Sequence, residues 1–452
     1  MSTEAGLFPD IDPVAEATAA QAKGAEPKCS GQPRLRYANR DQIEFRMCAL
    51  DQLLSEEHEA RTVWAYVENL DLTPLLQQIK AVDHGPGASA ADPRILIALW
   101  LYATLRGIGS ARELERRCDP QTGEVAFQWL AGGVSLNYHT LSTFRTAHVD
   151  YLDDLLTTSV ATLRQEGLVR LERVAQDGIK VRASAGASSF RREATLQHYL
   201  QEAEKQVQAL KTELNADPAA ANRRQQKARE RTARERLERV QRALEQLAQV
   251  EAQKKPKDKD KARTSTTDPD ARVMKMGDGG FRPAVNVQLS TDSATQVITG
   301  VDVTNSGGDQ GKMAPMVEQH EERYGQAPKQ MLVDGGFVKK EDIEAVSPQT
   351  TVYAPVPPSK DPERDAHTPC PNDSPAVAEW RSRMATDEAK AIYQRRSQHE
   401  CVNAIARNRG LQQFRVRGLQ KVRAVVLWYV LAHNLMRAVT LRAQRDQEGK
   451  TR

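Results

Sequence analysis

The chain has few cysteines, few aromatic residues and almost no net charge. Its 452 residues include five cysteines and 5% aromatic residues, and its formal net charge is +4 at pH 7. A sparse, odd-numbered set of cysteines argues against a disulfide-stabilised fold and is typical of a reducing cytoplasm. The small net charge excludes a strong field over the whole molecule, so any attraction to a polyanion must come from local patches.

The sequence also lacks a long hydrophobic run. Its most apolar stretch, residues 424–432, is too short to span a bilayer and predicts a buried helix. The first residues are acidic and rich in Ala and Pro, which is not typical of a secretory signal peptide. We therefore expect a cytoplasmic protein with no membrane partner.

Length and changes in composition predict several domains. With 39% hydrophobic residues, a chain of this length can form roughly two to four cores. We expect a flexible tail at 1–36, a mostly helical domain at 37–165, a core domain built from 166–190 and 265–440, a charged helical insertion at 191–264 and a tail at 441–452.

Three carboxylates stand in settings that suit a metal site. Asp177 and Asp334 each close a short β-prone run and precede a glycine, so the backbone beside each acid stays open to a ligand. Glu400 lies on a predicted helix among basic residues. Two aspartates and a glutamate can hold two divalent ions about 3.5–4 Å apart, one at the attacking and one at the leaving oxygen. Oxygen ligands favour Mg²⁺ or Mn²⁺.

The residues around Glu400 form a regular pattern. Tyr393, Arg396, Glu400 and Arg407 follow the order Tyr, two residues, Arg, three residues, Glu, six residues, Lys, with arginine in the last place. On a continuous helix Arg396, Glu400, Asn403 and Arg407 share one surface, which suits a site for a metal ion and a phosphate together. With this pattern the chain resembles the DDE transposases of bacterial insertion sequences. The resemblance also includes the runs around Asp177 and Asp334, and it spans roughly residues 40–440.

The resemblance implies a particular fold and activity. The expected fold is α/β, with an RNase H-like catalytic core of a mixed five-stranded sheet and flanking helices, an all-α N-terminal domain and a helical coiled-coil insertion. The expected activity is metal-dependent cleavage of double-stranded DNA at the terminal inverted repeats of the element, followed by strand transfer into target DNA. Bringing two DNA ends together implies a homodimer or higher oligomer on DNA, associated with the nucleoid.

The resemblance also assigns residues. It implies that three residues are catalytic and bind two Mg²⁺ or Mn²⁺ ions: Asp177, Asp334 and Glu400. It implies a second set that holds DNA phosphates near the cut: Tyr393, Arg396 and Arg407, with Lys180 and Lys275 as weaker candidates.

Residues 90–148 contain a helix-turn-helix candidate. Ser110 and Asn137 can each cap a helix, and the last helix carries exposed Thr, Ser, Arg and His side chains. These side chains resemble a DNA-recognition element in which His139 and Arg145 contact DNA. An ordinary helical bundle explains the same pattern.

Residues 191–264 predict two antiparallel helices. Apolar residues at spacings of three and four in 196–214 and again in 237–247 favour a coiled-coil hairpin. Residues 191–263 hold 19 Lys and Arg against 12 Asp and Glu, a balance of +7. A solvated arm without a partner, a DNA contact and a dimerisation element are all compatible with this pattern.

The order of elements after the insertion is what an RNase H-like fold needs. We expect antiparallel strands at 285–290 and 296–304, a helix at 313–324 capped by Asp309, strands at 330–333 and 351–355, and one helix over 387–408. In such a fold Asp177 and Asp334 lie on neighbouring central strands.

Three alternatives remain open at this point. His367, Cys370, His399 and Cys401 could in principle form a zinc site, although their spacing is irregular. The chain could be a catalytically silent DNA-binding relic of a transposase. It could also be an RNase H-like nuclease that cuts without joining.

Overall fold

The computed structural model describes residues 49–451, apart from 80, 82–88, 217–222, 360 and 362. The chain divides into two units, Met1–Cys48 and Ala49–Arg452. The expected tail at 1–36 lies outside the described residues, and everything below concerns the second unit.

The first part of this unit is helical, as the sequence predicts. A 3-10 helix at Leu50–Leu53 precedes seven helices: α1 (Glu59–Glu68), α2 (Thr73–Leu76), α3 (Pro93–Leu105), α4 (Ala111–Arg117), α5 (Val125–Ala131), α6 (Tyr138–Ala147) and α7 (Val149–Gln165). Asp92 caps α3, and the predicted caps Ser110 and Asn137 accept hydrogen bonds at the starts of α4 and α6. Helix α3 is apolar almost all round, and nearly all of it is buried.

The last helix of the chain, α15 (Leu419–Thr451), packs against α3, α6, α7 and one strand of the sheet. Its apolar run at 424–432 is buried, as predicted. By length and composition α15 resembles a membrane-spanning helix, but most of its apolar window is buried inside the protein.

The central sheet is mixed and has six strands, where the sequence predicts five. They are β1 (Arg173–Arg182), β4 (Arg272–Lys275), β5 (Phe281–Asp292), β6 (Ile298–Thr304), β7 (Gln330–Leu332) and β8 (Thr351–Tyr353). Strand β5 pairs antiparallel with β1 on one edge, while β7 and β8 continue parallel to β1 on the other side. Strands β4 and β6 both pair with the edge of β5 that does not face β1, one after the other along it. The sixth strand therefore adds no width to the sheet. This arrangement is consistent with an RNase H-like core.

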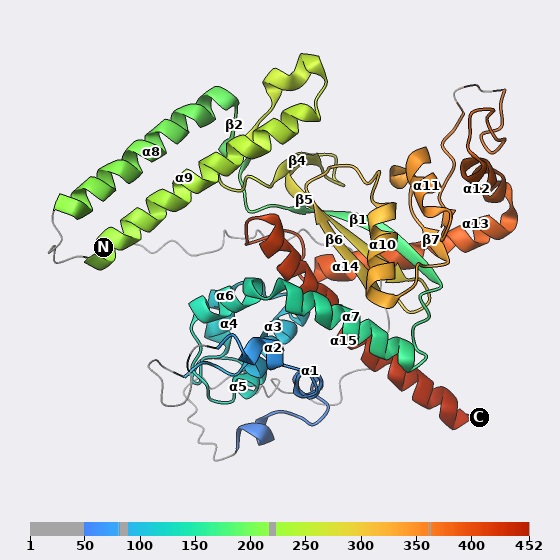
Figure 1. Ribbon diagram of the computed structural model, residues 1–452. Coiled ribbons are helices and arrows are strands. Elements are labelled where there is room, and N and C mark those ends of the chain that lie inside the picture. The colour runs from blue at the N-terminus through green and yellow to red at the C-terminus, as the bar shows by residue number, and fades with distance from the viewer. Residues whose placement is uncertain are drawn as a thin grey trace, which may run out of the picture. The chain divides into compact units, whose positions relative to one another are not determined.

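Helices cover both faces of the sheet (Figure 1). One hydrophobic core joins residues of β1 and β5 to the N-terminal helices, to α14 (Ser397–Asn408) and to α15, and a second core joins β1, β7 and β8 to the other core helices. These other helices are α10 (Met313–Tyr324), α11 (Lys340–Val346), α12 (Pro375–Ala385) and α13 (Asp387–Gln394).

Two predictions for these helices are wrong. The predicted helix over 387–408 is broken into α13 and α14, with Arg395 and Arg396 in the turn between them. Asp309 does not cap α10, whose N-cap is Lys312 with no side-chain hydrogen bond. The carboxylate of Asp309 instead accepts hydrogen bonds from the sheet residues Asn286 and Gln288.

The insertion is a helical hairpin, as predicted. Helices α8 (Glu193–Ala216) and α9 (Arg223–Ala252) lie side by side and project from the sheet (Figure 1). Leu196, Ala203 and Val207 of α8 and Val240 and Leu247 of α9 are buried. The short strands β2 (Phe190–Arg191) and β3 (Thr264–Ser265) pair at its base, so the chain leaves and re-enters the core at one place.

Candidate active site

Asp177 lies in the middle of β1. The strand continues to Arg182, so the prediction that Asp177 ends its strand is wrong. Asp177 pairs in register with Leu289 of β5, and its carboxylate accepts hydrogen bonds from its neighbour's N–H, at Gly178 (2.9 Å), and from Nδ2 of Asn403 (2.8 Å). The acid is therefore fixed both by the strand and by helix α14.

Asp334 lies level with Asp177. The parallel register of β1 and β7 pairs Ala175 with Leu332, the last residue of β7. Two residues further along stand Asp177, still within β1, and Asp334, which follows the end of β7 and caps the short 3-10 helix Gly335–Phe337. The sequence correctly predicts that β1 and β7 are neighbouring strands, but Asp334 lies in the turn after β7 rather than on the strand.

Burial and like charge act together on Asp177. Burial raises the pKa of Asp177 to about 6, with further increases from the charges of Asp334 and Asp309. The N–H of Gly178 and the charge of Arg396 oppose this increase. A buried carboxylate whose pKa is raised by neighbouring acids is characteristic of a place where a divalent cation would be bound favourably.

Tyr393 and Arg396 lie beside the two aspartates. The Arg396 guanidinium is 6.0 Å from the centre of the Tyr393 ring. Burial raises the pKa of Tyr393, Arg396 lowers it, and Asp334 and Asp177 raise it further. Both signature residues are therefore within electrostatic range of the acids.

Glu400 is turned towards Arg396. Its Oε1 accepts a hydrogen bond from Nη2 of Arg396 at 3.1 Å, and its side chain is 62% exposed. No three His, Cys, Asp or Glu side chains among the described residues form a group that could hold a metal ion. The structure thus brings Asp177 and Asp334 together, whereas the carboxylate of Glu400 is paired with Arg396.

Glu400, Asn403 and Arg407 follow one another on α14 at spacings of three and four, and Arg396 at the N-cap of this helix pairs with Glu400. These residues differ in exposure, because Asn403 is buried while Glu400 and Arg407 are exposed. Asn403 donates a hydrogen bond to Asp177, and its Oδ1 has no hydrogen-bond partner among the described atoms. Sequence reasoning missed this contact because it joins two residues far apart in the chain.

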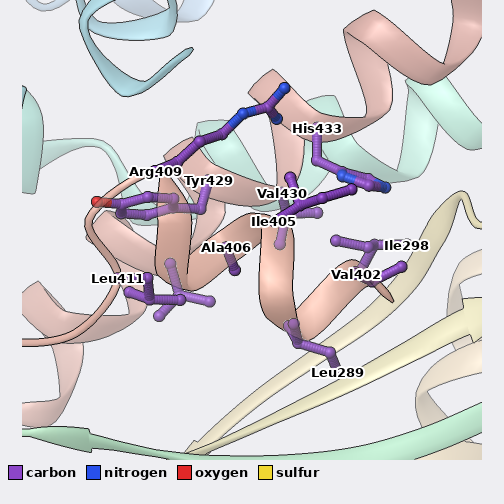
Figure 2. Close-up of a pocket in the computed structure, with 11 residues that line it drawn as sticks. Leu289, Ile298, Val402, Ile405, Ala406, Arg409, Leu411, Tyr429, Val430 and His433 are labelled. Carbon is purple, nitrogen blue, oxygen red and sulfur yellow. The ribbon is translucent and has the colours of Figure 1, made fainter. Parts of the chain in front are cut away.

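Helix α14 is held beside the sheet by apolar contacts. Val402, Ile405 and Ala406 face Leu289 of β5 and Val430 of α15 (Figure 2). The remaining space is only about 10 Å³, which is packing space rather than a ligand site. This packing fixes the position of α14 and therefore of Asn403.

A polar network lies on the opposite face of β1. Asp309 Oδ1 accepts hydrogen bonds from Nδ2 of Asn286 (2.7 Å) and Nε2 of Gln288 (2.6 Å). A Cβ atom at Gly178 would be 2.5 Å from both Asp309 Oδ1 and Gln288 Nε2. This network therefore requires glycine at position 178. Sequence reasoning did not predict the network. The alternation of polar Asn286 and Gln288 with apolar residues in β5 was the available signal.

The other phosphate-binding candidates, Lys180, Lys275 and Arg407, lie on three different elements. Lys180 is half-buried on β1, on the face opposite Asp177, and pairs in register with Asn286. Lys275 is exposed at the end of β4, and Arg407 is exposed in the last turn of α14.

The two candidates on α6 differ sharply. His139 is exposed and lies against Tyr138. Arg145 is only 6% exposed, so the prediction that it lies on the exposed side of the helix is wrong. Its guanidinium covers the Trp100 ring and donates to the carbonyl of Gly109.

The zinc alternative finds no support in the described part of the chain. His399 is buried, and its Nδ1 is 2.7 Å from the hydroxyl of Thr291. Burial lowers the pKa of His399 to about 3, so its imidazole is neutral. No metal-binding group involving His399 is present among the described residues.

Two family models match the chain. The Transposase DDE domain matches residues 360–439, which include α13 and α14, and the transposase domain DUF772 matches residues 48–147, which include α1 to α6. No curated protein and no solved structure matches the chain. The matched domains define a DNA-processing enzyme.

More narrowly, both matched models are transposase domains, and together they support a DDE transposase of the insertion-sequence type. This confirms the resemblance found in the sequence. Enzymes of this family generally use divalent metal ions. The assignment of Tyr393, Arg396, Glu400 and Arg407 to the signature stays a prediction.

Proposed function

We propose that this transposase cuts DNA at the ends of its insertion sequence and joins the freed 3′-hydroxyl to target DNA. The observation that carries the proposal is the register of β1 and β7, which sets Asp177 level with Asp334 in the centre of the sheet. The match to a DDE domain around Glu400 supports the third acid.

The residues present suit a divalent cation only in part. Asp177 and Asp334 offer oxygen ligands whose negative charges oppose each other, and the unpartnered Oδ1 of Asn403 is a further oxygen beside Asp177. Glu400 is the third ligand in the proposal. Bound ions would activate the attacking oxygen and stabilise the leaving oxygen.

The protein residues have separate roles in the proposed reaction. Asn403 and the Gly178 N–H hold the Asp177 carboxylate in one orientation. Arg396 exchanges its ion pair with Glu400 for a DNA phosphate, which frees the glutamate, and Tyr393 supports the guanidinium. The remaining predicted contacts, Arg407, Lys180, Lys275, His139 and Arg145, are proposed to bind DNA further from the cut.

Two element ends must be brought together at one target. We therefore propose a homodimer or larger assembly formed on double-stranded DNA. We place the protein in the cytoplasm at the nucleoid. The hairpin of α8 and α9 is available for either DNA or a second copy.

The test uses labelled DNA that carries the ends of the element, with Mg²⁺ or Mn²⁺, and compares wild type with Glu400→Gln. We expect nicking at the element boundary to fall by at least about a hundredfold, because even indirect changes at metal sites cost 10–100-fold. DNA binding should survive.

Glu379→Gln is the matched control. Glu379 forms the same type of ion pair, four residues before Arg383, on an exposed helical surface of α12. It should cleave like wild type. Equal cleavage by the Glu400 variant and wild type would refute the role of Glu400.

A silent DNA-binding protein is the second candidate, favoured by the ion pair that holds Glu400 away from the aspartates. Wild-type protein that binds the element ends without cutting them in either metal would establish this reading.

A further inference from the structure

A cavity lined by arginines lies at the C-terminal end of β1, beside Arg182. Its volume is about 600 Å³, and its walls come from the turn before α4, from α6, from the end of β1, from the 410–415 loop and from α15. Arg145, Arg182 and Arg415 line it, and none of the described residues that line it is Asp or Glu. Arg182 is five residues beyond Asp177, about 16 Å along the strand.

Arg145 is a buried cation without an anionic partner. It is 6% exposed, donates through Nη1 to the carbonyl of Gly109 (2.6 Å) and lies 4.5 Å above Trp100. Its Nε is buried and has no hydrogen-bond partner among the described atoms. Burial lowers the pKa of Arg145 to about 10, so it stays charged at neutral pH. A buried charge with no counter-charge is unfavourable, and a bound anion would offset that cost.

The other two arginines have their guanidinium groups available. Arg182 and Arg415 are exposed, and neither forms an ion pair or a side-chain hydrogen bond with a described residue. The nearby acid Glu113 is mainly engaged by other arginines: its hydrogen bond to Arg117 lowers its pKa most, it also pairs with Arg116, and Arg415 acts on it only as a more distant charge. The cavity therefore carries three positive charges, and no carboxylate is among its described lining residues.

The end of β1 and the 410–415 loop form one wall. The backbone N–H of Arg182 donates to Gln412 O, and the N–H of Phe414 donates to Arg182 O. These bonds fix Arg182 and the loop that carries Arg415 relative to each other. The cavity thus rests on ordered backbone rather than on a free loop.

Tyr429 adds a neutral donor to the cavity. Burial raises the pKa of Tyr429, while Arg145 and Arg415 lower it, so both guanidinium groups lie near the phenol. Its hydroxyl end points away from the aliphatic residues around it, towards the loop that follows α14 (Figure 2). A Cβ at Gly410 would be 3.4 Å from this hydroxyl, and Gly410 also has a φ of +89° that favours glycine.

We propose that this cavity binds a phosphate group through Arg145, Arg182 and Arg415, with the hydroxyl of Tyr429 as a further donor. Planar guanidinium groups match the oxygens of phosphate, and several of them around one anion give strong charge-assisted hydrogen bonds. The phosphate belongs either to a DNA backbone or to a free phosphate compound. The inference depends on the proposed function only for the DNA source.

The experiment compares wild type with Arg182→Gln, Arg415→Gln and the double variant, all without divalent metal. Binding to a labelled DNA duplex is followed by fluorescence anisotropy over a range of salt concentrations. Inorganic phosphate is titrated into the same proteins by calorimetry in a second arm. Arg445→Gln is the control, because Arg445 is already engaged by Glu166 and Asp446 and does not line the cavity.

For a DNA phosphate, the double variant should lose about 0.9 from the slope of log K against log salt, the value for one neutralised phosphate. For a free phosphate, wild type should show binding heat that the double variant lacks. Both results support the site. Unchanged slope and unchanged heat in a double variant with a native circular dichroism spectrum would overturn it.

This result is separable from the cleavage test. The binding measurements contain no metal and do not use the acids, so loss of cleavage in one experiment and loss of the phosphate contact in the other are distinct outcomes. If wild type cleaves DNA and the double variant binds DNA and phosphate as wild type does, the cavity has no part in the mechanism. The transposase proposal would then remain intact.

Discussion

Strand β1 carries two charged regions of opposite sign. In its middle, Asp177 stands beside Asp334, and burial raises the pKa of Asp177. At its end, Arg182 joins Arg145 and Arg415, and burial lowers the pKa of Arg145. The acid is fixed by Asn403 and by the strand backbone, whereas two of the three arginines are exposed on long side chains. The Asp177 carboxylate is therefore held in one orientation, whereas the Arg182 and Arg415 side chains have no side-chain hydrogen bond among the described residues.

The largest effect should come from Asp177→Asn. The folded-state pKa of Asp177 is raised from 3.8 to about 6, so folding favours its protonated form. The free energy of unfolding should therefore fall as pH rises from about 4 to about 6, by on the order of 3 kcal/mol. The variant should be more stable than wild type at pH 7 and lack this loss, which urea unfolding across pH 4–8 would measure.

Magnesium binding gives a second measurement on Asp177. Added Mg²⁺ should stabilise wild type at pH 7 through binding to the folded state, and it should not stabilise the Asp177 variant. A flat pH profile for wild-type stability would contradict the raised pKa of Asp177.

A second prediction tests the other face of the acidic region. Gly178→Ala places a methyl group 2.5 Å from Asp309 Oδ1 and Gln288 Nε2, and such overpacking should lower the free energy of unfolding by about 1–3 kcal/mol. Cleavage should also fall, because the backbone that carries Asp177 must shift. Gly308→Ala is the control, since nothing lies within 4 Å of a Cβ there. Equal melting temperatures for the two variants would show that the Asp309 network does not fix β1.

The smallest expected effect concerns the basic region. Inorganic phosphate should stabilise wild type by about 0.4 kcal/mol at a concentration equal to its Kd. Arg415→Gln should lose this gain but keep stabilisation by Mg²⁺, while Asp177→Asn should show the reverse. Differential scanning fluorimetry with both ligands on both variants measures this crossed pattern. Loss of both responses in either variant would mean that the two regions are not independent.

Local rules in the sequence predicted much of this fold. Ser110 and Asn137 cap the helices that they were expected to cap, because a cap depends only on the next few residues. These caps need no knowledge of distant contacts. The pairing of β1 with β7 does need such knowledge, and it was predicted only from the fold that the family resemblance implies.

The errors share a physical cause. The helix over 387–408 breaks at Arg395 and Arg396, because Val402 and Ala406 of α14 pack against the sheet and α15 independently of the helix before it. Arg145 is buried because Trp100, far away in sequence, accepts its guanidinium. Asp309 binds Asn286 and Gln288 rather than a helix end. In each case a tertiary contact overrode a local preference.

Helix α15 has a consequence for how the protein is made. It follows the whole sheet in sequence, yet it fills the core between α3, α6 and α7 and also contacts β6. The N-terminal helices therefore leave the ribosome with a large apolar surface that stays uncovered until α15 has been synthesised. Chains that stop before α15 would expose that surface and aggregate.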